Sequence, residues 1–171
     1  MRTIIVGSGR VGAGLASQLA GEGHEVTILD VDVGSFRRLD PAFSGQALRG
    51  DGTDESVLRR AGAEGADCFL ALTNGDNRNI LAAQLAAETF GIPRVLAKIN
   101  DPVRAKAYAA LGIDTINRTE MMIDSIDRYM GKPGVPGATD VNEAPSRHQG
   151  RDHEPVAVSF SSPGAESAGG R

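Results

Sequence analysis

The feature that most constrains this chain is the glycine-rich hexad Gly-Ser-Gly-Arg-Val-Gly at positions 7–12, which directly follows the apolar run Thr3–Val6. After the hexad, Leu15 and Leu19 lie at helical spacing from Val11, which predicts a helix. A strand that runs through a glycine turn into a helix presents unpaired backbone N–H groups at the helix N-terminus, where phosphate groups bind. The hexad therefore predicts a strand–turn–helix unit that can hold a phosphate-bearing ligand.

Each glycine of the hexad has its own role in such a unit. Gly7 permits a tight turn, Gly9 lets a pyrophosphate approach closely, and Gly12 lets the helix pack tightly on the sheet. Asp30 follows Gly12 by 18 residues, at the end of the second apolar run. A carboxylate there accepts hydrogen bonds from an adenosine ribose and repels a 2′-phosphate, which favours NAD(H), ADP or ATP over NADP(H). The arginine pair at 37–38 weakens that preference slightly, and the alternative is that the glycines only make a turn.

From residue 1 to about residue 129, apolar runs of strand length alternate with segments of helical periodicity. This alternation is typical of α/β proteins and predicts a doubly wound parallel sheet of about six strands with helices on both faces. The predicted strands are Thr3–Val6, Glu25–Leu29, Gln46–Leu48, Cys68–Leu72, Arg94–Ala97 and Thr115–Ile116. The helices predicted after the first are 54–61, 76–90, 102–111 and an amphipathic final helix at 119–129.

The residues from 131 to 171 differ in composition, being dense in Gly, Pro, Ser and Ala. We interpret 1–130 as one nucleotide-binding domain and 131–171 as a disordered tail. The net charge of −4 gives no basic field for nucleic acid, and no apolar stretch approaches the roughly 18 residues of a membrane span. With no secretory signal and a single cysteine, the chain is predicted to be cytoplasmic, without direct membrane insertion.

Two further polar segments follow predicted strands, at the sheet edge where open α/β sheets bind ligands. In the first, Gly50–Thr53, the Asp51 carboxylate can accept from an adenine amino group, and Thr53 either contacts a ligand or caps the next helix. The second is 73–79, where Asp76 is equally a ligand contact or a helix cap. Lys98 ends the fifth strand, where its ammonium can reach a phosphate, the alternative being a solvated lysine.

The groups that an enzyme of this class needs are missing from the pattern. The sequence has no GxxxxGK[ST] loop for nucleotide hydrolysis, and no tyrosine and lysine four residues apart for carbonyl reduction. No histidine or cysteine ends a predicted strand on the ligand edge. We therefore predict no catalytic residue, no metal-binding residue and no enzymatic activity.

Three blocks together make the chain similar to a known family. They are "IIVGSGRVGAGLASQL" with Asp30, "GDGTDESVLRRAGAEGADCFLALTNGDNRNILAAQLA", and "RVLAKINDP" with "LGIDTINRTE". The chain resembles the TrkA-N (RCK-N) domain, the nucleotide-binding regulatory subunit of bacterial Trk/Ktr-type potassium uptake systems. The resemblance covers about residues 1–130 and implies a Rossmann-type fold that binds NAD(H) or ATP/ADP.

The resemblance also implies which residues hold the nucleotide and which partners the chain has. The nucleotide would lie against Gly7, Ser8, Gly9, Arg10 and Val11, with Asp30 on the ribose, Asp51 and Thr53 near the adenosine, Thr73 and Asn74 on the opposite wall, and Lys98 near phosphate. Many relatives have arginine where Lys98 stands. The domain would dimerise partly through the final helix, and would form a homodimer or higher-order ring, alone or with a paralogous subunit. This assembly would lie beneath a membrane potassium-translocating subunit and gate it. Typical relatives continue into a second domain, which the tail at 131–171 replaces here.

Two other hypotheses stay open from the sequence. The first is a small NAD-dependent oxidoreductase or the cofactor-binding half of one, which the missing acid and base residues disfavour. The second is a scaffold whose nucleotide site no longer functions.

Overall fold

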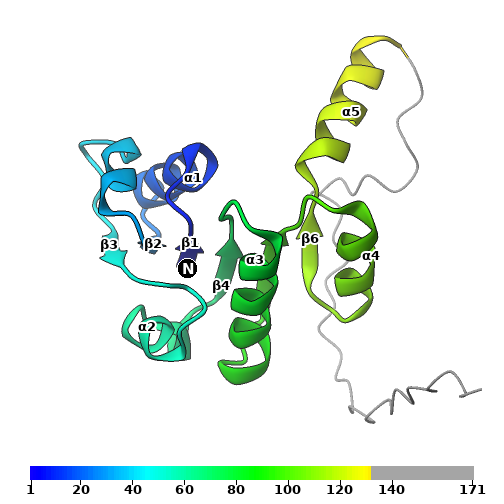
Figure 1. Ribbon diagram of the computed structural model, residues 1–171. Helices are drawn as coiled ribbons and strands as arrows, with labels where there is room; N and C mark the ends of the chain where they lie inside the picture. Colours follow the sequence, from blue (N-terminus) through cyan, green and yellow to red (C-terminus); the bar gives the residue numbers. More distant parts are fainter. Residues whose placement is uncertain (132–171) are drawn as a thin grey trace, which may run out of the picture. The chain divides into compact units, whose positions relative to one another are not determined.

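The strands form one parallel sheet in the order β3-β2-β1-β4-β5-β6 (Figure 1). Their bounds are β1 Arg2–Val6, β2 Glu25–Asp30, β3 Gln46–Arg49, β4 Cys68–Ala71, β5 Arg94–Lys98 and β6 Asp114–Ile116. The computed structural model describes residues 1–131, so the predicted tail lies outside the described residues apart from its first position. The six-stranded parallel sheet confirms the predicted fold class, with each strand within two residues of its predicted bounds.

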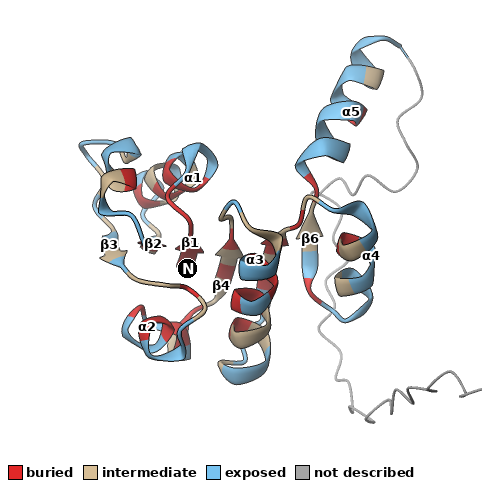
Figure 2. Cartoon of the chain, viewed as in Figure 1, coloured by how far each residue is buried: buried red, intermediate tan, exposed pale blue. Residues whose placement is uncertain are grey.

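The sheet buries one apolar layer on each face, because successive side chains of a strand point to opposite sides. Ile4 and Val6 of β1 join Phe69 in the core under the helices that follow β3 and β4, whereas Ile5 joins Ile28 under the first helix. All five side chains are at most 2% exposed. Burial is concentrated on the strands and on the helix faces that cover them (Figure 2).

The helical elements between the strands agree with the predicted α/β alternation. They are α1 Arg10–Gly21, η1 Val33–Arg38, α2 Glu55–Arg60, η2 Ala63–Gly65, α3 Asp76–Gln84, η3 Leu85–Thr89, α4 Pro102–Ala110 and α5 Arg118–Tyr129. The helix predicted over 76–90 ends as a π-helical segment, η3, in which the Phe90 N–H donates to the Leu85 carbonyl at 3.2 Å. The 3₁₀ helices η1 and η2 were not predicted.

Helix α1 is buried on the sheet mainly through small residues, and its half-buried Leu15 and Leu19 also pack against this core. Its buried residues are Gly12, Ala13, Ala16 and Ala20, whereas Val11 is 67% exposed. Small side chains bring the helix axis close to the sheet, which a stripe of valine and leucine would prevent. The position of α1 against β1 is what sets the geometry of the hexad.

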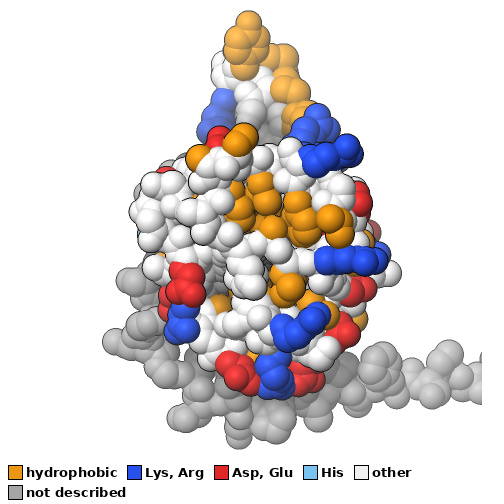
Figure 3. Space-filling model, turned by 90° about the vertical axis from the view of Figure 1, so that its left-hand side faces the viewer, with side chains coloured by type: hydrophobic (Ala, Val, Ile, Leu, Met, Phe, Trp, Pro, Cys, Tyr) orange, Lys and Arg blue, Asp and Glu red, His pale blue; other side chains and the backbone are white. Residues whose placement is uncertain are grey.

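Helix α5 leaves much of its apolar side uncovered. Met122, Ile123, Ile126 and Met130 are each about half exposed, from 49% to 59%. In Figure 3 the distant projection at the top is this helix, and it carries apolar side chains. No helix within residues 1–131 has the length and apolar content needed to cross a membrane.

Candidate functional site

A cleft of about 470 Å³ opens at the carboxyl ends of β1, β2 and β4. The order of the sheet reverses between β1 and β4, because the chain runs from β1 outward to β3 and then returns to place β4 on the other side of β1. Crevices at such a reversal are where open α/β sheets bind their ligands. The hexad lines one side of this cleft, and Thr73 and Asn74 line the other.

The hexad has the backbone geometry that its glycines predict. Gly7 has a φ of +107°, and a Cβ atom there would lie 2.9 Å from the backbone of Leu72 and Thr73. A Cβ on Gly12 would lie 2.0 Å from the Gly7 carbonyl oxygen, so only glycine lets α1 begin so close to the turn. Gly9 has no atom within 4 Å of its Cβ direction, which leaves space beside the α1 N-terminus.

Asp30 holds the hexad from the end of β2. Its carboxylate accepts a hydrogen bond from the backbone N–H of Ser8 at 2.7 Å and another from that of Asp32 at 2.9 Å. Ser8 is fully buried, and its hydroxyl donates to the Ser35 carbonyl at 3.3 Å. The hydrogen bonds from Ser8 and Asp32 hold the Asp30 carboxylate in place. Because each carboxylate oxygen can accept two hydrogen bonds, Asp30 can still accept from a ligand in the cleft, which it lines.

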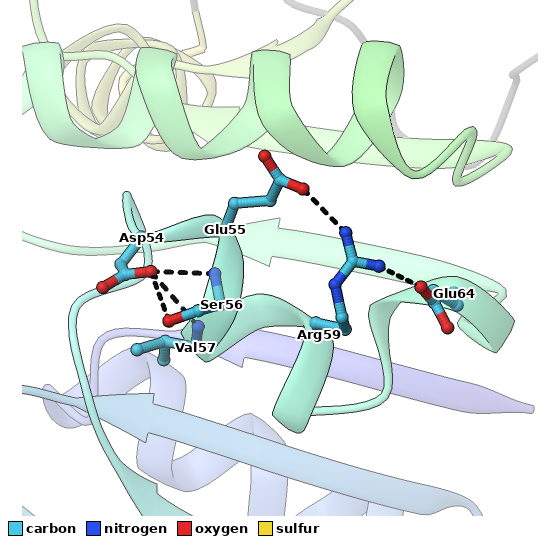
Figure 4. A network of polar contacts seen from close by, with 6 residues as sticks. All are labelled: Asp54, Glu55, Ser56, Val57, Arg59 and Glu64. Atoms are coloured by element: carbon cyan, nitrogen blue, oxygen red, sulfur yellow. Dashed lines mark hydrogen bonds and ion pairs between the residues drawn. The ribbon is translucent and has the colours of Figure 1, made fainter.

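The Gly50–Thr53 segment brings one of its two predicted side chains to the cleft. Asp51 lines the cleft, and its carboxylate accepts from both the backbone N–H of Thr53, at 3.0 Å, and its hydroxyl, at 2.9 Å. Thr53 itself is not among the lining residues. The cap of α2 is Asp54, which accepts from Ser56 and Val57, so Thr53 does not take the capping role considered for it (Figure 4).

Neighbouring charges on α2 hold this helix in place. The Arg59 guanidinium lies between the carboxylates of Glu55, at 2.7 Å, and Glu64 (Figure 4). These two carboxylates raise the pKa of Arg59, the Glu55 hydrogen bond most. At the other end of the helix, hydrogen bonds from Ser56 lower the pKa of the Asp54 carboxyl. These contacts cap α2 and join it to η2, and none of their side chains lines the cleft.

Asp76 and Lys98 are two more predicted site residues that lie outside the cleft lining. The Asp76 carboxylate accepts from the backbone N–H groups of Asn100 and Asp101, each at 3.0 Å. Burial alone would raise the pKa of Asp76, but these hydrogen bonds and that from the Asn100 side chain lower it overall. Burial and the positive charge of Arg118 lower the pKa of Lys98. Val11 and Gly12 are also absent from the lining.

The cleft contains residues that the sequence alone did not identify. Arg38 lines it from η1 and Arg78 lines it from the first turn of α3, together with the predicted Arg10. The Arg78 side chain is exposed and has no hydrogen-bond or ion-pair partner among residues 1–131. One feature of the sequence could have indicated η1. Aspartate is a common capping residue and Asp32 caps η1, and two arginines lie in the last turn of this helix. Asp32 and Ser35 complete this corner of the cleft.

Comparison with known proteins identifies the family of residues 3–118 and relatives that cover most of the chain. The model of the TrkA-N domain family matches residues 3–118. A Trk system potassium uptake protein TrkA from Streptomyces coelicolor is 45% identical over 135 residues, covering 79% of this chain and 60% of that protein. The chain thus spans less than two thirds of the length of that relative.

Two solved structures share the fold at low identity. The Kef CTD of Shewanella denitrificans in its AMP-bound form has a TM-score of 0.65 and 21% identity, covering 76% of this chain and 79% of that one. The GsuK channel bound to NAD has a TM-score of 0.61 and 19% identity, covering 76% of this chain and 23% of that one. At these identities the likeness concerns the fold alone.

Proposed function

The chain belongs to the TrkA-N domain family, and from this premise we propose that it binds NAD(H) or an adenine nucleotide in the cleft. The observation that carries the proposal is the fixed pair of Asp30 and the hexad. Asp30 is held by the backbone N–H of Ser8 at 2.7 Å, beside the open space at Gly9. A carboxylate for ribose hydroxyls and a helix N-terminus for phosphate are the two halves of an adenosine phosphate site.

The negative and positive side chains of the cleft suit different parts of a nucleotide. Carboxylates at Asp30 and Asp51 suit the ribose and the adenine amino group, whereas Arg10, Arg38 and Arg78 are the cations that line the cleft. We propose that Arg78 contacts the phosphates from the side opposite the hexad, in addition to or in place of Lys98. Arginine suits this role because its planar guanidinium binds phosphate through two hydrogen bonds.

Titration calorimetry of the full chain with NAD⁺, NADH, ADP, ATP and NADP⁺ tests this proposal. We expect Asp30→Ala to weaken nucleotide binding by about 10- to 100-fold, the usual value of a hydrogen bond to a charged group. Arg78→Gln should weaken it by about fivefold or more and Lys98→Gln by less, with Arg60→Gln on α2 as an exposed control. If no nucleotide binds at millimolar concentration, or if Asp30→Ala binds as the unaltered chain does, the proposal fails.

We propose that the site senses its ligand and catalyses no reaction. The titratable side chains lining the cleft are those of three aspartates and three arginines. Arginine keeps its proton in proteins, and all three aspartates accept hydrogen bonds from backbone N–H groups. Such a set can bind and orient a nucleotide, and it includes none of the histidine, lysine, tyrosine or cysteine side chains that often serve as general acids or bases.

We further propose that the protein is a cytoplasmic regulatory subunit, peripheral to the membrane, that gates a potassium-translocating membrane subunit. The name of the Streptomyces coelicolor relative and the channel context of the GsuK structure support this. The half-exposed apolar side of α5 supports assembly with a second copy, as a dimer or larger ring, alone or with a paralogous subunit. Co-purification from native cells should recover a polytopic transporter subunit, and recovery of the chain alone would contradict the proposal.

A further inference from the structure

Three groups of hydrogen bonds lie between the cleft and α5, and the first is made by Asn79, which holds the cleft-lining Thr73. The Asn79 side chain is fully buried on α3, and its Oδ1 accepts from the backbone N–H of Thr73 at 2.9 Å and from the Thr73 hydroxyl at 2.6 Å. Its Nδ2 donates to the Thr73 carbonyl at 3.1 Å and to the Lys98 carbonyl at 2.7 Å. A residue that lines the cleft is thereby tied to the end of β5.

The second link joins the start of α3 to the turn between β5 and α4. The Asp76 carboxylate accepts from the backbone N–H of Asn100 at 3.0 Å, from its side-chain Nδ2 at 2.9 Å, and from the backbone N–H of Asp101 at 3.0 Å. Any movement of the 73–79 segment must therefore either carry Asn100 with it or break these hydrogen bonds.

The third link reaches α5. The Asn117 side chain, only 6% exposed, donates from Nδ2 to the Asn100 carbonyl at 3.0 Å. Its Oδ1 accepts from the backbone N–H groups of Thr119 at 2.9 Å and Glu120 at 3.2 Å, and so caps α5. One amide group thus holds both the β5–α4 turn and the first turn of the helix with the exposed apolar side.

These hydrogen bonds leave one buried atom unsatisfied. The Oδ1 atom of Asn100 is buried and has no hydrogen-bond partner among residues 1–131. A buried acceptor without a partner is unfavourable, because it has given up its hydrogen bond to water without gaining another. Asn100 therefore keeps an acceptor that a different position of the β5–α4 turn could satisfy.

We propose that Asn79, Asp76, Asn100 and Asn117 are positioning residues that transmit occupancy of the cleft to α5. The inference rests on the proposed nucleotide binding, because the ligand acts through Thr73 and Asn74. A ligand that prefers one position of the 73–79 segment shifts Asn100, and Asn117 passes the shift to the first turn of α5. Such coupling is reciprocal, so the state of α5 also changes the affinity of the cleft.

Hydrogen–deuterium exchange of the full chain, with and without saturating ADP or NAD⁺, tests the inference. In the unaltered chain we expect the ligand to slow exchange in 73–79 and, by about fivefold or more, in the first turn of α5. Asn117→Asp keeps the cap, because a carboxylate accepts as the amide oxygen does, but it cannot donate to Asn100. In this variant we expect the ligand to change α5 exchange by less than about twofold. The affinity of the cleft for the ligand should change by at most about fivefold, which is the size of the coupling between the cleft and α5 in the unaltered chain.

The ratio of exchange with and without ligand separates coupling from mere loss of stability. A weakened α5 exchanges faster in both states and leaves the ratio unchanged. Asp54→Asn, at the cap of α2 away from the three links, should keep the full response. If Asn117→Asp does not fold, Asp76→Asn weakens the second link, because one of its two acceptor oxygens becomes an N–H donor, and should reduce the response.

The outcomes distinguish this inference from the proposed function. Slowed exchange in 73–79 without any change in α5 of the unaltered chain would overturn the inference and leave nucleotide binding intact. A full α5 response in a folded Asn117→Asp or Asp76→Asn would also overturn it. Absence of slowed exchange everywhere, together with no calorimetric binding, would instead overturn the proposed function.

Discussion

One side of the cleft, the hexad at 7–12, is shaped by backbone, whereas the other, the 73–79 segment, is shaped by side chains. On the hexad side, Gly7 and Gly12 allow atoms to approach where a Cβ would clash, and Asp30 fixes the turn through a backbone N–H. On the opposite side, the amide of Asn79 fixes Thr73 through its hydrogen bonds. The cleft therefore combines a side that the backbone fixes with a side whose position depends on side-chain hydrogen bonds, which a substitution can remove.

This difference suggests a division of roles. A backbone-built surface has few alternative conformations and suits a constant task, the binding of phosphate and ribose. A network of side-chain hydrogen bonds with one unsatisfied acceptor suits a surface that moves between two arrangements. The variants below change one side at a time, in order of decreasing expected effect.

The largest effect should come from Gly12→Ala on the backbone-built side. The added Cβ would lie 2.0 Å from the Gly7 carbonyl oxygen, and neither backbone can move without displacing α1 or β1. We expect the free energy of unfolding to fall by about 3 kcal/mol or more in urea denaturation, with loss of nucleotide binding.

The matched control for this variant lies on the same helix. A Cβ on Gly14 meets no atom within 4 Å, so Gly14→Ala should leave binding unchanged and raise the free energy of unfolding by up to about 1 kcal/mol. Equal stability of the two variants would show that the close approach at Gly12 has no energetic role.

An intermediate effect should come from Asn79→Ala on the side-chain-built side. The change leaves the Thr73 backbone N–H and the Lys98 carbonyl without their present partners, which should lower the free energy of unfolding by about 2 kcal/mol. Asn77→Ala, exposed on the same turn of α3, should cost less than about 0.5 kcal/mol in the same urea titration. A loss for Asn79→Ala no greater than for Asn77→Ala would contradict the assigned role of Asn79.

The smallest effect should be the pH dependence of the link through Asp76. Its pKa is lower in the folded chain, so its contribution to stability is present above the ordinary carboxyl pKa, near 4, and is lost as the pH falls through the folded value. We therefore expect Asp76→Asn to lower the urea midpoint at pH 7, and the gap to the unaltered chain to narrow between about pH 5 and pH 3. A gap that stays constant over this range would mean that the Asp76 charge adds nothing to the link.

Local patterns in the sequence were sufficient to predict most of the fold. The run Cys68–Leu72 is apolar throughout and Glu25–Leu29 is mostly so, as expected of strands covered on both faces, and both form strands within one residue of the predicted ends. The apolar side of α1 was harder to predict because the sheet selects small residues for close packing, which leaves Val11 at the surface.

The two sides of the cleft differed in how far the sequence could predict them. Glycine positions and Asp30 follow a spacing that can be read along the chain. Asn79, by contrast, lies 19 residues from Lys98, and nothing in the pattern around it indicates that contact. Arg78 reaches the cleft from the first turn of α3 and Arg38 from the last turn of η1, and only the packing of the elements reveals both placements.

The central place of β1 has a consequence for how the protein is made. β1 comes first along the chain, yet one of its two edges pairs with Cys68–Ala71 of β4. During synthesis that edge, Thr3–Val6, stays open until Cys68–Ala71 has left the ribosome, because β2 and β3 add on the other side. An apolar strand with an open edge can pair with the wrong partner during this interval. The nascent chain is therefore most vulnerable to aggregation before β4 emerges.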